Sequence, residues 1–296
     1  MLFIINPKAG NVDVELLNSK ITRICKENKI SYEIMKTSGE NDKLKIGSKI
    51  EENSYKRIIV AGGDGTINLV ASVLKNTTIS MGLLACGSAN GLISNFNIPD
   101  DLDSQIELAL EGTKYSMDMI AVNGHECLHI ADLGLNAELI RSYDNSSISG
   151  KFGYFLHSIP TIFNSKYPYD FEITDSESTK SYRGILLAFG NAQKFGTGAA
   201  INPKSKMNDG KFEIIIFKKL NIFQVLKTFF NNHDLEKDFV ERYSLEKAEI
   251  DCKRPLSLQI DGEFMGEVSN LKVEIIPNSI NVIATKYEPV FIDGNA

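Results

Sequence analysis

Residues 57–68 read Arg-Ile-Ile-Val-Ala-Gly-Gly-Asp-Gly-Thr-Ile-Asn, an apolar run that enters a glycine-rich turn and then an amphipathic helix. Glycine permits positive φ and close approach of a ligand to the main chain, and free N–H groups at a helix start favour an anion. Asp64 in this turn can hold Mg²⁺, directly or through water, or accept a proton from a substrate hydroxyl. An isolated Asp-Gly is usually a plain turn. Here five consecutive residues of this kind, Gly62 to Thr66, lie between a strand and a helix, and this favours a phosphate-binding turn. The residues that we expect to contact a nucleotide phosphate here are Gly62, Gly63, Gly65, Thr66 and Asn68.

The bulk composition indicates an ordinary globular protein. The chain has 296 residues, which suits two domains that each bury a core. Its 43% hydrophobic and 24% charged residues lie near the average for globular proteins. A formal net charge of -6 gives no general attraction to nucleic acid or to an anionic membrane. We therefore expect no nucleic-acid partner.

The four cysteines are scattered without metal-ligand spacing, and no signal peptide precedes the first predicted strand. This pattern is typical of a reducing cytosol. No apolar run approaches the roughly 20 residues that span a bilayer, so a membrane substrate would be reached from the surface. The expectation is a cytoplasmic protein without a transmembrane segment, peripheral at the inner membrane surface.

The first third of the chain alternates strand and helix patterns. Short apolar runs at 2–6, 32–36, 57–61 and 81–85 predict strands, and amphipathic segments separate them. Such alternation predicts an α/β domain with a parallel sheet covered on both faces. The candidate nucleotide loops all follow carboxyl ends of strands, which is the edge where ligands bind in open α/β sheets.

The remainder of the chain has the pattern of many short strands, which predicts an antiparallel β-sandwich. We expect a hairpin in which strands 117–122 and 126–133 are joined by Asn123-Gly124. Helical segments are expected at 152–163 and 222–230. The predicted organisation is an α/β nucleotide-binding domain at 1–115, a β-rich lipid-substrate domain at 116–286, and a tail at 287–296 that returns to the first domain.

Gly-Gly-Asp-Gly-Thr resembles a motif shared by diacylglycerol kinases, sphingosine and ceramide kinases, bacterial lipid kinases and NAD kinases. Further stretches, in the order that the lipid kinases have them, make the whole chain resemble the diacylglycerol kinase/sphingosine kinase-like bacterial lipid kinase family. NAD kinases lack the later ones. The stretches are Asn6-Pro7-Lys8-Ala9-Gly10, Gly87-Ser88-Ala89-Asn90-Gly91, Asn208-Asp209-Gly210-Lys211 and Asp261-Gly262-Glu263.

The resemblance implies a nucleotide site for ATP in the first domain. It assigns the loop from Asn6 to Gly10 to the nucleotide, with Lys8 as a mobile phosphate partner, although a plain Asn-Pro turn is the alternative. Thr37 matches a family threonine near the nucleotide, and Ser88 matches a Thr/Ser that donates a hydroxyl to phosphate. Either residue could instead cap a helix.

The resemblance also implies Mg²⁺ and a catalytic base. Asp209 would bind the cation together with main-chain oxygens of neighbours such as Lys206 and Lys211, or would simply be a turn residue before a strand. Glu263 would be the base that takes the proton of the acceptor hydroxyl, with Asp64 as the other catalytic carboxylate. The alternative for Glu263 is a solvated residue after an Asp-Gly turn.

The chain departs from the bacterial diacylglycerol kinase pattern at two positions where carboxylates are usual, which are Leu69 and Gly91. The predicted function is an ATP-dependent lipid kinase that phosphorylates a diacylglycerol-like or sphingoid hydroxyl at a membrane surface. The departures motivate one alternative, a catalytically weakened lipid- or nucleotide-binding protein, and NAD kinase is another. The acceptor lipid and the oligomeric state, including a homodimer, stay open.

His125-Glu-Cys-Leu-His129 matches the letters of a zinc-protease signature. Two histidines four positions apart share a ligating face only on a helix, because on a strand they stand about 13 Å apart. The preceding Asn-Gly turn indicates a strand. We therefore expect no zinc site here.

Overall fold

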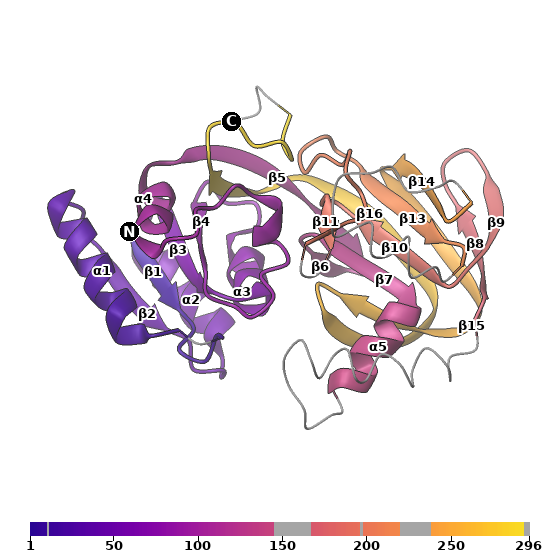
Figure 1. The fold of residues 1–296 in the computed structure, drawn as a ribbon, viewed down its shortest axis with the longest axis horizontal. Coiled ribbons are helices and arrows are strands. Elements are labelled where there is room, and N and C mark those ends of the chain that lie inside the picture. The colour runs from indigo at the N-terminus through magenta and orange to yellow at the C-terminus, as the bar shows by residue number, and fades with distance from the viewer. Residues whose placement is uncertain (11, 145–166, 196–197, 220–237, 293–296) are drawn as a thin grey trace. The chain divides into compact units, whose positions relative to one another are not determined.

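The computed structural model describes residues 1–10, 12–144, 167–195, 198–219 and 238–292 (Figure 1). The chain forms two compact units: the first comprises Met1–Asp118, Met207–Asp209 and Pro277–Ala296, and the second comprises Met119–Lys206 and Gly210–Ile276. Strands β5 (Thr113–Val122) and β16 (Glu263–Ala284) contribute residues to both units. The predicted helical segments 152–163 and 222–230 lie outside the described residues.

The first unit contains a parallel sheet with helices on both faces, as the alternating sequence pattern predicted. Its strands are adjacent in the order β2 (Glu33–Lys36), β1 (Leu2–Ile5), β3 (Arg57–Gly62) and β4 (Ser80–Ala85), and the end of β16 pairs in parallel with β4. Its helices are α1 (Val14–Glu27), α2 (Asp42–Glu52), α3 (Asp64–Leu74), α4 (Leu102–Glu111) and the single turn η1 (Ile93–Asn95).

Helices α1 and α4 cover one face of this sheet, because their apolar stripes pack on the same side of β1, β3 and β4. Leu17, Ile21 and Ile106 are fully buried or nearly so in this layer. Both helices begin at an aspartate, Asp13 or Asp101, whose carboxylate accepts hydrogen bonds from main-chain N–H groups of the first turn. The two helices form one layer over the sheet, and the loops at the carboxyl ends of the strands lie at one edge of that sheet.

The tail that follows β16 packs within the first unit. The Glu288 carboxylate is buried and accepts hydrogen bonds from the main-chain N–H of Asn97 and from Thr285. Phe291 stacks on Tyr115 with ring centroids 4.6 Å apart. The tail also fixes the short segment Met207–Asp209 of this unit through hydrogen bonds, a contact that the sequence did not indicate.

The second unit is antiparallel and has the predicted sandwich character. Neighbouring strands of its main sheet follow the order β14, β13, β10, β7, β15 and β16, while β8 pairs with β15 and β9, and β5 pairs with β6. The bounds are β6 (His125–Cys127), β7 (Ile130–Gly134), β8 (Tyr169–Thr174), β9 (Thr179–Gly184), β10 (Leu186–Gly190), β11 (Lys194–Phe195), β12 (Ala199–Ala200), β13 (Phe212–Phe217), β14 (Val240–Leu245) and β15 (Lys247–Ile260), together with helix α5 (Leu135–Asp144).

The predicted strand 126–133 is interrupted in the structure. Strand β6 ends at Cys127 and β7 begins at Ile130. The main-chain N–H groups of Leu128, His129 and Ile130 donate to the carboxylate of Asp261. A single strand from 126 to 133 was therefore wrong, because a buried side chain replaces the neighbouring strand as hydrogen-bond partner at this point.

Strands β9 and β14 were not predicted. The β9 segment is largely exposed and polar, and β14 is half-buried with charged residues among its apolar ones, so neither shows the alternating apolar pattern that identifies a strand.

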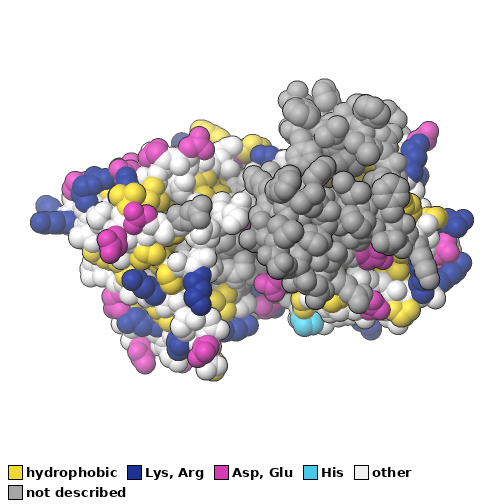
Figure 2. Space-filling model, turned by 60° about the horizontal axis from the view of Figure 1, so that its bottom comes forward, with side chains coloured by type: hydrophobic (Ala, Val, Ile, Leu, Met, Phe, Trp, Pro, Cys, Tyr) yellow, Lys and Arg dark blue, Asp and Glu magenta, His cyan; other side chains and the backbone are white. Residues whose placement is uncertain are grey.

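In the part of the chain that the structure describes, no helix is both long enough and apolar enough to cross a bilayer. Acidic and basic side chains of the described residues are interspersed on the face drawn in Figure 2. This distribution agrees with the modest net charge of -6.

Candidate active site

Most of the predicted nucleotide residues lie on three loops that meet at one edge of the parallel sheet of the first unit, or in the first turns of helix α3, which follows one of these loops. The loop after β1 begins at Asn6, whose main-chain N–H donates to the Ala61 carbonyl at 2.9 Å. The Asn6 side chain donates to Thr66 Oγ1 at 2.9 Å, which links this loop to the start of α3. The loop after β4 joins them, since Cys86 N–H donates to the Gly62 carbonyl at 3.3 Å.

Glycines allow the main chains of these loops to approach closely. A Cβ added to Gly87 would lie 2.4 Å from Gly63 Cα, and one added to Gly10 would lie 2.6 Å from the Cys86 carbonyl oxygen. Gly10 also has a φ of +53°, a conformation that side-chain-bearing residues rarely adopt. The loops therefore have the bare main chain and the helix start that suit a phosphate. This arrangement fits the predicted ATP.

Asp64 braces two of these loops. It is the first residue of α3, and its two carboxylate oxygens accept hydrogen bonds from the main-chain N–H groups of Gly91, at 2.8 Å, and Leu92, at 3.0 Å. Gly91 thus contributes to this link through its main-chain N–H. Each Asp64 oxygen keeps further lone-pair capacity, so the bracing is compatible with a role beside Mg²⁺.

The other predicted nucleotide residues lie on the same loops or beside them. Pro7, Lys8 and Ser88 are exposed, while Ala9 is buried. Lys8 N–H donates to the side-chain oxygen of Asn6 at 2.9 Å, so the start of this loop is an Asx turn. Thr37 follows β2, and its main-chain N–H donates to the Ile5 carbonyl next to that loop. The exposed side chains are free to contact a ligand without rearrangement of the core.

We predict that Gly87→Ala weakens ATP binding by about 5- to 150-fold. The added methyl group would press on Gly63 and push apart the two loops that are expected to hold the phosphates. The ATP-bound arrangement then carries the usual overpacking cost of about 1–3 kcal/mol. Gly47→Ala is the matched control, because an added Cβ there meets nothing within 4 Å. Calorimetric titration with an ATP analogue measures both variants. Equal affinity of Gly87→Ala and the wild type would remove this loop from the nucleotide site.

The predicted cation residues are distributed over both units in the chain. Asp209 belongs to the first unit, whereas Lys206 and Lys211 belong to the second. Within the first unit, Asn208 exchanges two hydrogen bonds with the main chain of Ile292, which anchors the residue next to Asp209. Among the described residues there is no cluster of three or more acidic, histidine or cysteine side chains for a metal. A cation on one carboxylate and main-chain carbonyls would need water to complete its shell.

The third predicted site, in the second unit, is the turn between β15 and β16. Asp261 and Gly262 both have positive φ, at 49° and 91°, as a type I′ hairpin turn requires. Glu263 follows as the first residue of β16 and is exposed. Its side chain makes no hydrogen bond or ion pair with another described residue. The carboxylate is therefore presented to solvent at the tip of a hairpin.

Asp261 anchors this turn to residues 128–130, which lie between β6 and β7. Its carboxylate is buried, accepts N–H groups from three successive residues, and lies 2.7 Å from His129 Nδ1. Burial raises the pKa of Asp261, but the charge of His129 and the hydrogen bonds outweigh burial and leave the pKa below its usual value. The sequence signal was the Asp-Gly pair, which indicated a turn but not this anchorage.

A second buried carboxylate, Asp132, was missed by the sequence analysis. It lies on β7 opposite Gln259 of β15 and is fully buried. Its Oδ2 accepts hydrogen bonds from Asn136 and Gln259, both at 2.6 Å. Burial raises the pKa of Asp132 to about 7, although these hydrogen bonds oppose the shift. An acidic residue inside the apolar run Ile130-Ala-Asp-Leu133 was the available signal.

We predict that the stability of Asp132→Asn relative to wild type is greater at pH 8 than at pH 5. Because the folded-state pKa is raised from 3.8 to about 7, the unfolded chain loses this proton at lower pH than the folded chain. The wild type therefore loses stability as pH rises from 3.8, the usual pKa, to about 7, the folded-state pKa, and its stability reaches a plateau above that pH. At about 1.36 kcal/mol per pKa unit, the effect over the whole window is about 4 kcal/mol.

Urea unfolding of wild type and Asp132→Asn at both pH values measures this effect. A difference between the two proteins that does not change with pH would contradict the assignment.

The zinc-protease letters do not form a helix. His125 lies on β6, and His129 lies between β6 and β7 beside Asp261. We predict that purified protein carries no stoichiometric zinc, which metal analysis can measure. Tight zinc that is lost from the double variant His125→Ala/His129→Ala would contradict this prediction.

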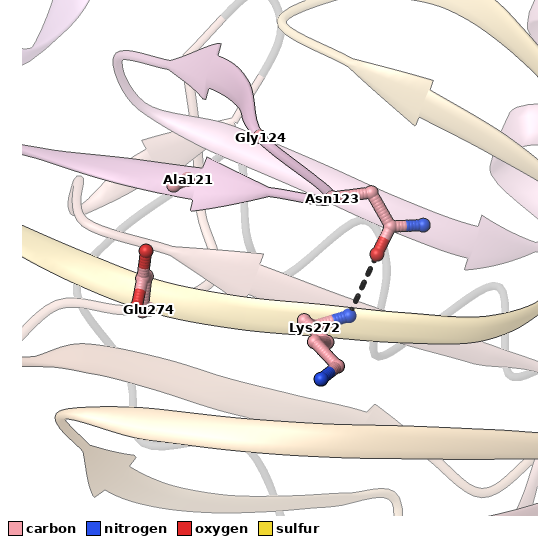
Figure 3. Close-up of a pocket in the computed structure, with 5 residues that line it drawn as sticks. All are labelled: Ala121, Asn123, Gly124, Lys272 and Glu274. Atoms are coloured by element: carbon pink, nitrogen blue, oxygen red, sulfur yellow. Dashed lines mark hydrogen bonds between the residues drawn. The ribbon is translucent and has the colours of Figure 1, made fainter.

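A pocket of about 420 Å³ lies on the second unit and is lined by Ala121, Asn123, Gly124, Lys272 and Glu274. Figure 3 shows that it lies between the β5–β6 turn and β16, where Lys272 N–H donates to Asn123 Oδ1 at 2.8 Å. None of the predicted site residues lines this pocket.

Comparison with known proteins agrees with this architecture. Residues 1–122 match the Diacylglycerol kinase catalytic domain family, and residues 130–284 match the YegS C-terminal NAD kinase beta sandwich-like domain family. A Yersinia enterocolitica protein named "Probable lipid kinase YegS-like" is 26% identical over 287 residues, which cover 94% of this chain and 95% of that protein.

Solved structures share the fold. A crystal structure of a diacylglycerol kinase-like protein from Bacillus anthracis str. Sterne has a TM-score of 0.80 at 20% identity, with 96% of each chain covered. An NAD kinase from Archaeoglobus fulgidus, solved in complex with ATP, has a TM-score of 0.54 at 13% identity and covers 97% of this chain and 94% of its own. At these identities the likeness concerns the fold alone.

Proposed function

Because the chain belongs to the lipid kinase-like family that combines a diacylglycerol kinase catalytic domain with a YegS C-terminal domain, we propose that it is an ATP-dependent lipid kinase. It transfers the γ-phosphate of ATP to a hydroxyl of a diacylglycerol-like or sphingoid lipid. The observation that carries the proposal is the meeting of three glycine-rich loops around the start of α3, braced by Asp64. The cytoplasmic face of a membrane is the proposed place of action, with the lipid reached from the surface.

In the proposed mechanism, loop main chain and the α3 N-terminus hold the phosphates, and Ser88 and Lys8 add side-chain donors. When bound, Mg²⁺ would neutralise charge on the phosphates, with Asp64 and Asp209 as its carboxylate candidates and Lys206 and Lys211 as carbonyl donors. Glu263 accepts the proton of the lipid hydroxyl. The hydroxyl oxygen forms the new bond to the γ-phosphorus, while the bond between the γ-phosphorus and the β–γ bridging oxygen breaks. The products are a phosphorylated lipid and ADP.

The exposure of Glu263 supports its role in this mechanism. A general base must come within hydrogen-bond reach of the proton that it removes, and the described residues leave this carboxylate without a competing partner. Its main chain also follows a turn whose two central residues are held by hydrogen bonds to buried groups.

The acceptor class is tested by separate incubations of the purified full chain with ATP, Mg²⁺ and one acceptor. The acceptors are diacylglycerol, sphingosine and ceramide in mixed micelles, and NAD in solution. We expect a phosphorylated product with at least one of the lipids and none with NAD. Conversion of NAD to NADP would establish the NAD kinase alternative. ATP binding without any product would favour a catalytically weakened binding protein.

A further inference from the structure

The turn that carries Glu263 is connected to the interior of the second unit by Gln259. The Gln259 side chain is fully buried on β15, three positions before Gly262. Its Oε1 accepts the main-chain N–H of Gly262 at 2.7 Å, and its Nε2 donates to Asp132 Oδ2 at 2.6 Å. One amide thus links a buried carboxylate to the middle of an exposed turn.

This connection fixes the orientation of the Gln259 amide. Asp132 Oδ2 also accepts from Asn136, so the carboxyl group supplies an acceptor to both amides. The Gln259 amide must therefore direct its NH₂ group inward and its oxygen toward Gly262. Reversal of this amide would place two acceptors together at one end and two donors together at the other.

A hairpin turn needs no such support from side chains, since positive φ at its two central residues is sufficient. Here the turn has two independent anchors, the Asp261 carboxylate on residues 128–130 and the Gln259 amide on Gly262. Both anchors are buried, whereas the next residue, Glu263, is exposed and makes no side-chain contact of this kind among the described residues. The geometry of the turn is more constrained than a connection between strands requires.

We propose that Gln259 is a positioning residue for Glu263, and that it acts through its hydrogen bonds to Asp132 and to the main chain of Gly262. This inference rests on the proposed function, in which Glu263 is the base. Misplacement of a reacting group by about 1 Å can cost about 10²-fold in rate. Loss of the Gln259 link should therefore lower turnover while the ATP loops, which lie in the first unit, keep their affinity.

The test uses Gln259→Leu, which removes both hydrogen bonds, and the double variant Asp132→Asn/Gln259→Glu, which exchanges donor and acceptor. In the double variant, the new NH₂ group at position 132 takes the place of Oδ2. It can donate one hydrogen to the new carboxylate at position 259 and the other to Asn136, whose amide turns to present its oxygen. The second oxygen of that carboxylate then accepts from Gly262. The single variant Gln259→Glu serves as reference. Circular dichroism and thermal unfolding determine the folded fraction to which each rate is normalised.

For folded Gln259→Leu we expect kcat to fall by about 10- to 100-fold, with the KM for ATP within about twofold of wild type. The double variant should recover most of kcat. An unchanged kcat in Gln259→Leu, when Glu263→Gln loses turnover, would overturn the positioning role and leave the proposed function intact. A folded double variant without recovery would also overturn it.

Amide hydrogen exchange supplies a readout that does not depend on catalysis. The peptide that contains Gly262 should exchange faster in Gln259→Leu than in wild type, and the double variant should restore its protection. If the wild type phosphorylates no lipid, the proposed function fails, whereas the exchange result still decides whether Gln259 holds the turn. Equal exchange in wild type and Gln259→Leu would overturn the inference by itself.

Discussion

Glu263→Gln should lower lipid phosphorylation by about 10²–10⁴-fold, which is the usual scale for loss of a general base. The substitution keeps the size and shape of the side chain but removes its ability to accept the hydroxyl proton. Because Glu263 is exposed and makes no hydrogen bond or ion pair with another described residue, the fold should not change. ATP affinity should also stay within about twofold, since the predicted ATP loops lie in the other unit.

The measurement is phosphate transfer to a lipid acceptor in mixed micelles, together with binding of an ATP analogue to the same protein preparations. Glu267→Gln, at an exposed position on the same strand β16, is the matched control and should retain turnover. Unchanged transfer in Glu263→Gln would remove Glu263 from the mechanism and leave Asp64 as the base candidate. Loss of both transfer and ATP binding would indicate a structural role.

Asp261→Asn should reduce the free energy of unfolding by about 3–5 kcal/mol, the scale seen when one partner of a buried pair is removed. Asn tolerates the left-handed conformation that this position adopts, at φ 49°, so the change isolates the carboxylate. Its NH₂ group would face some of the main-chain N–H groups that now donate to Asp261, and His129 would lose its charged partner.

Chemical denaturation at neutral pH measures this loss, with Glu172→Ala as an exposed control that should change stability by less than about 0.5 kcal/mol. The effect should depend on pH. Since the folded-state pKa of Asp261 is below its usual value, its contribution is present above the unfolded-state pKa and is lost as pH falls through the folded-state pKa. A stability equal to wild type at neutral pH would contradict the anchoring role.

The sequence predicted those parts of the molecule whose signals are local. The run from Arg57 to Asn68 predicted a strand, a turn and a helix because each of them depends on neighbouring residues. The same holds for Asn123-Gly124, where the structure has the expected hairpin. The parallel sheet of the first unit and the antiparallel strands of the second follow from periodicity in short segments.

The supporting residues could not be predicted in this way, because their partners are distant in sequence. Gln259 contacts Asp132 across 127 positions, and Asp261 contacts Leu128 across 133. These pairs exist only because β15 and β7 are neighbours in one register, which the pattern of either strand does not specify. The break after Cys127 has the same origin. Asp64 was predicted as a catalytic carboxylate. That it accepts hydrogen bonds from Gly91 and Leu92 could be recognised only from the geometry of the loops.

The central claim is that the chain transfers the γ-phosphate of ATP to a lipid. The most direct measurement incubates the purified full chain with Mg²⁺ and total lipid extract, in parallel with ATP radiolabelled at the γ-phosphate and with ATP radiolabelled at the α-phosphate, followed by extraction into organic solvent. We predict that label from the γ-position enters the lipid phase and that label from the α-position does not. A lipid phase without label under both conditions, from protein shown to bind ATP, would contradict the claim.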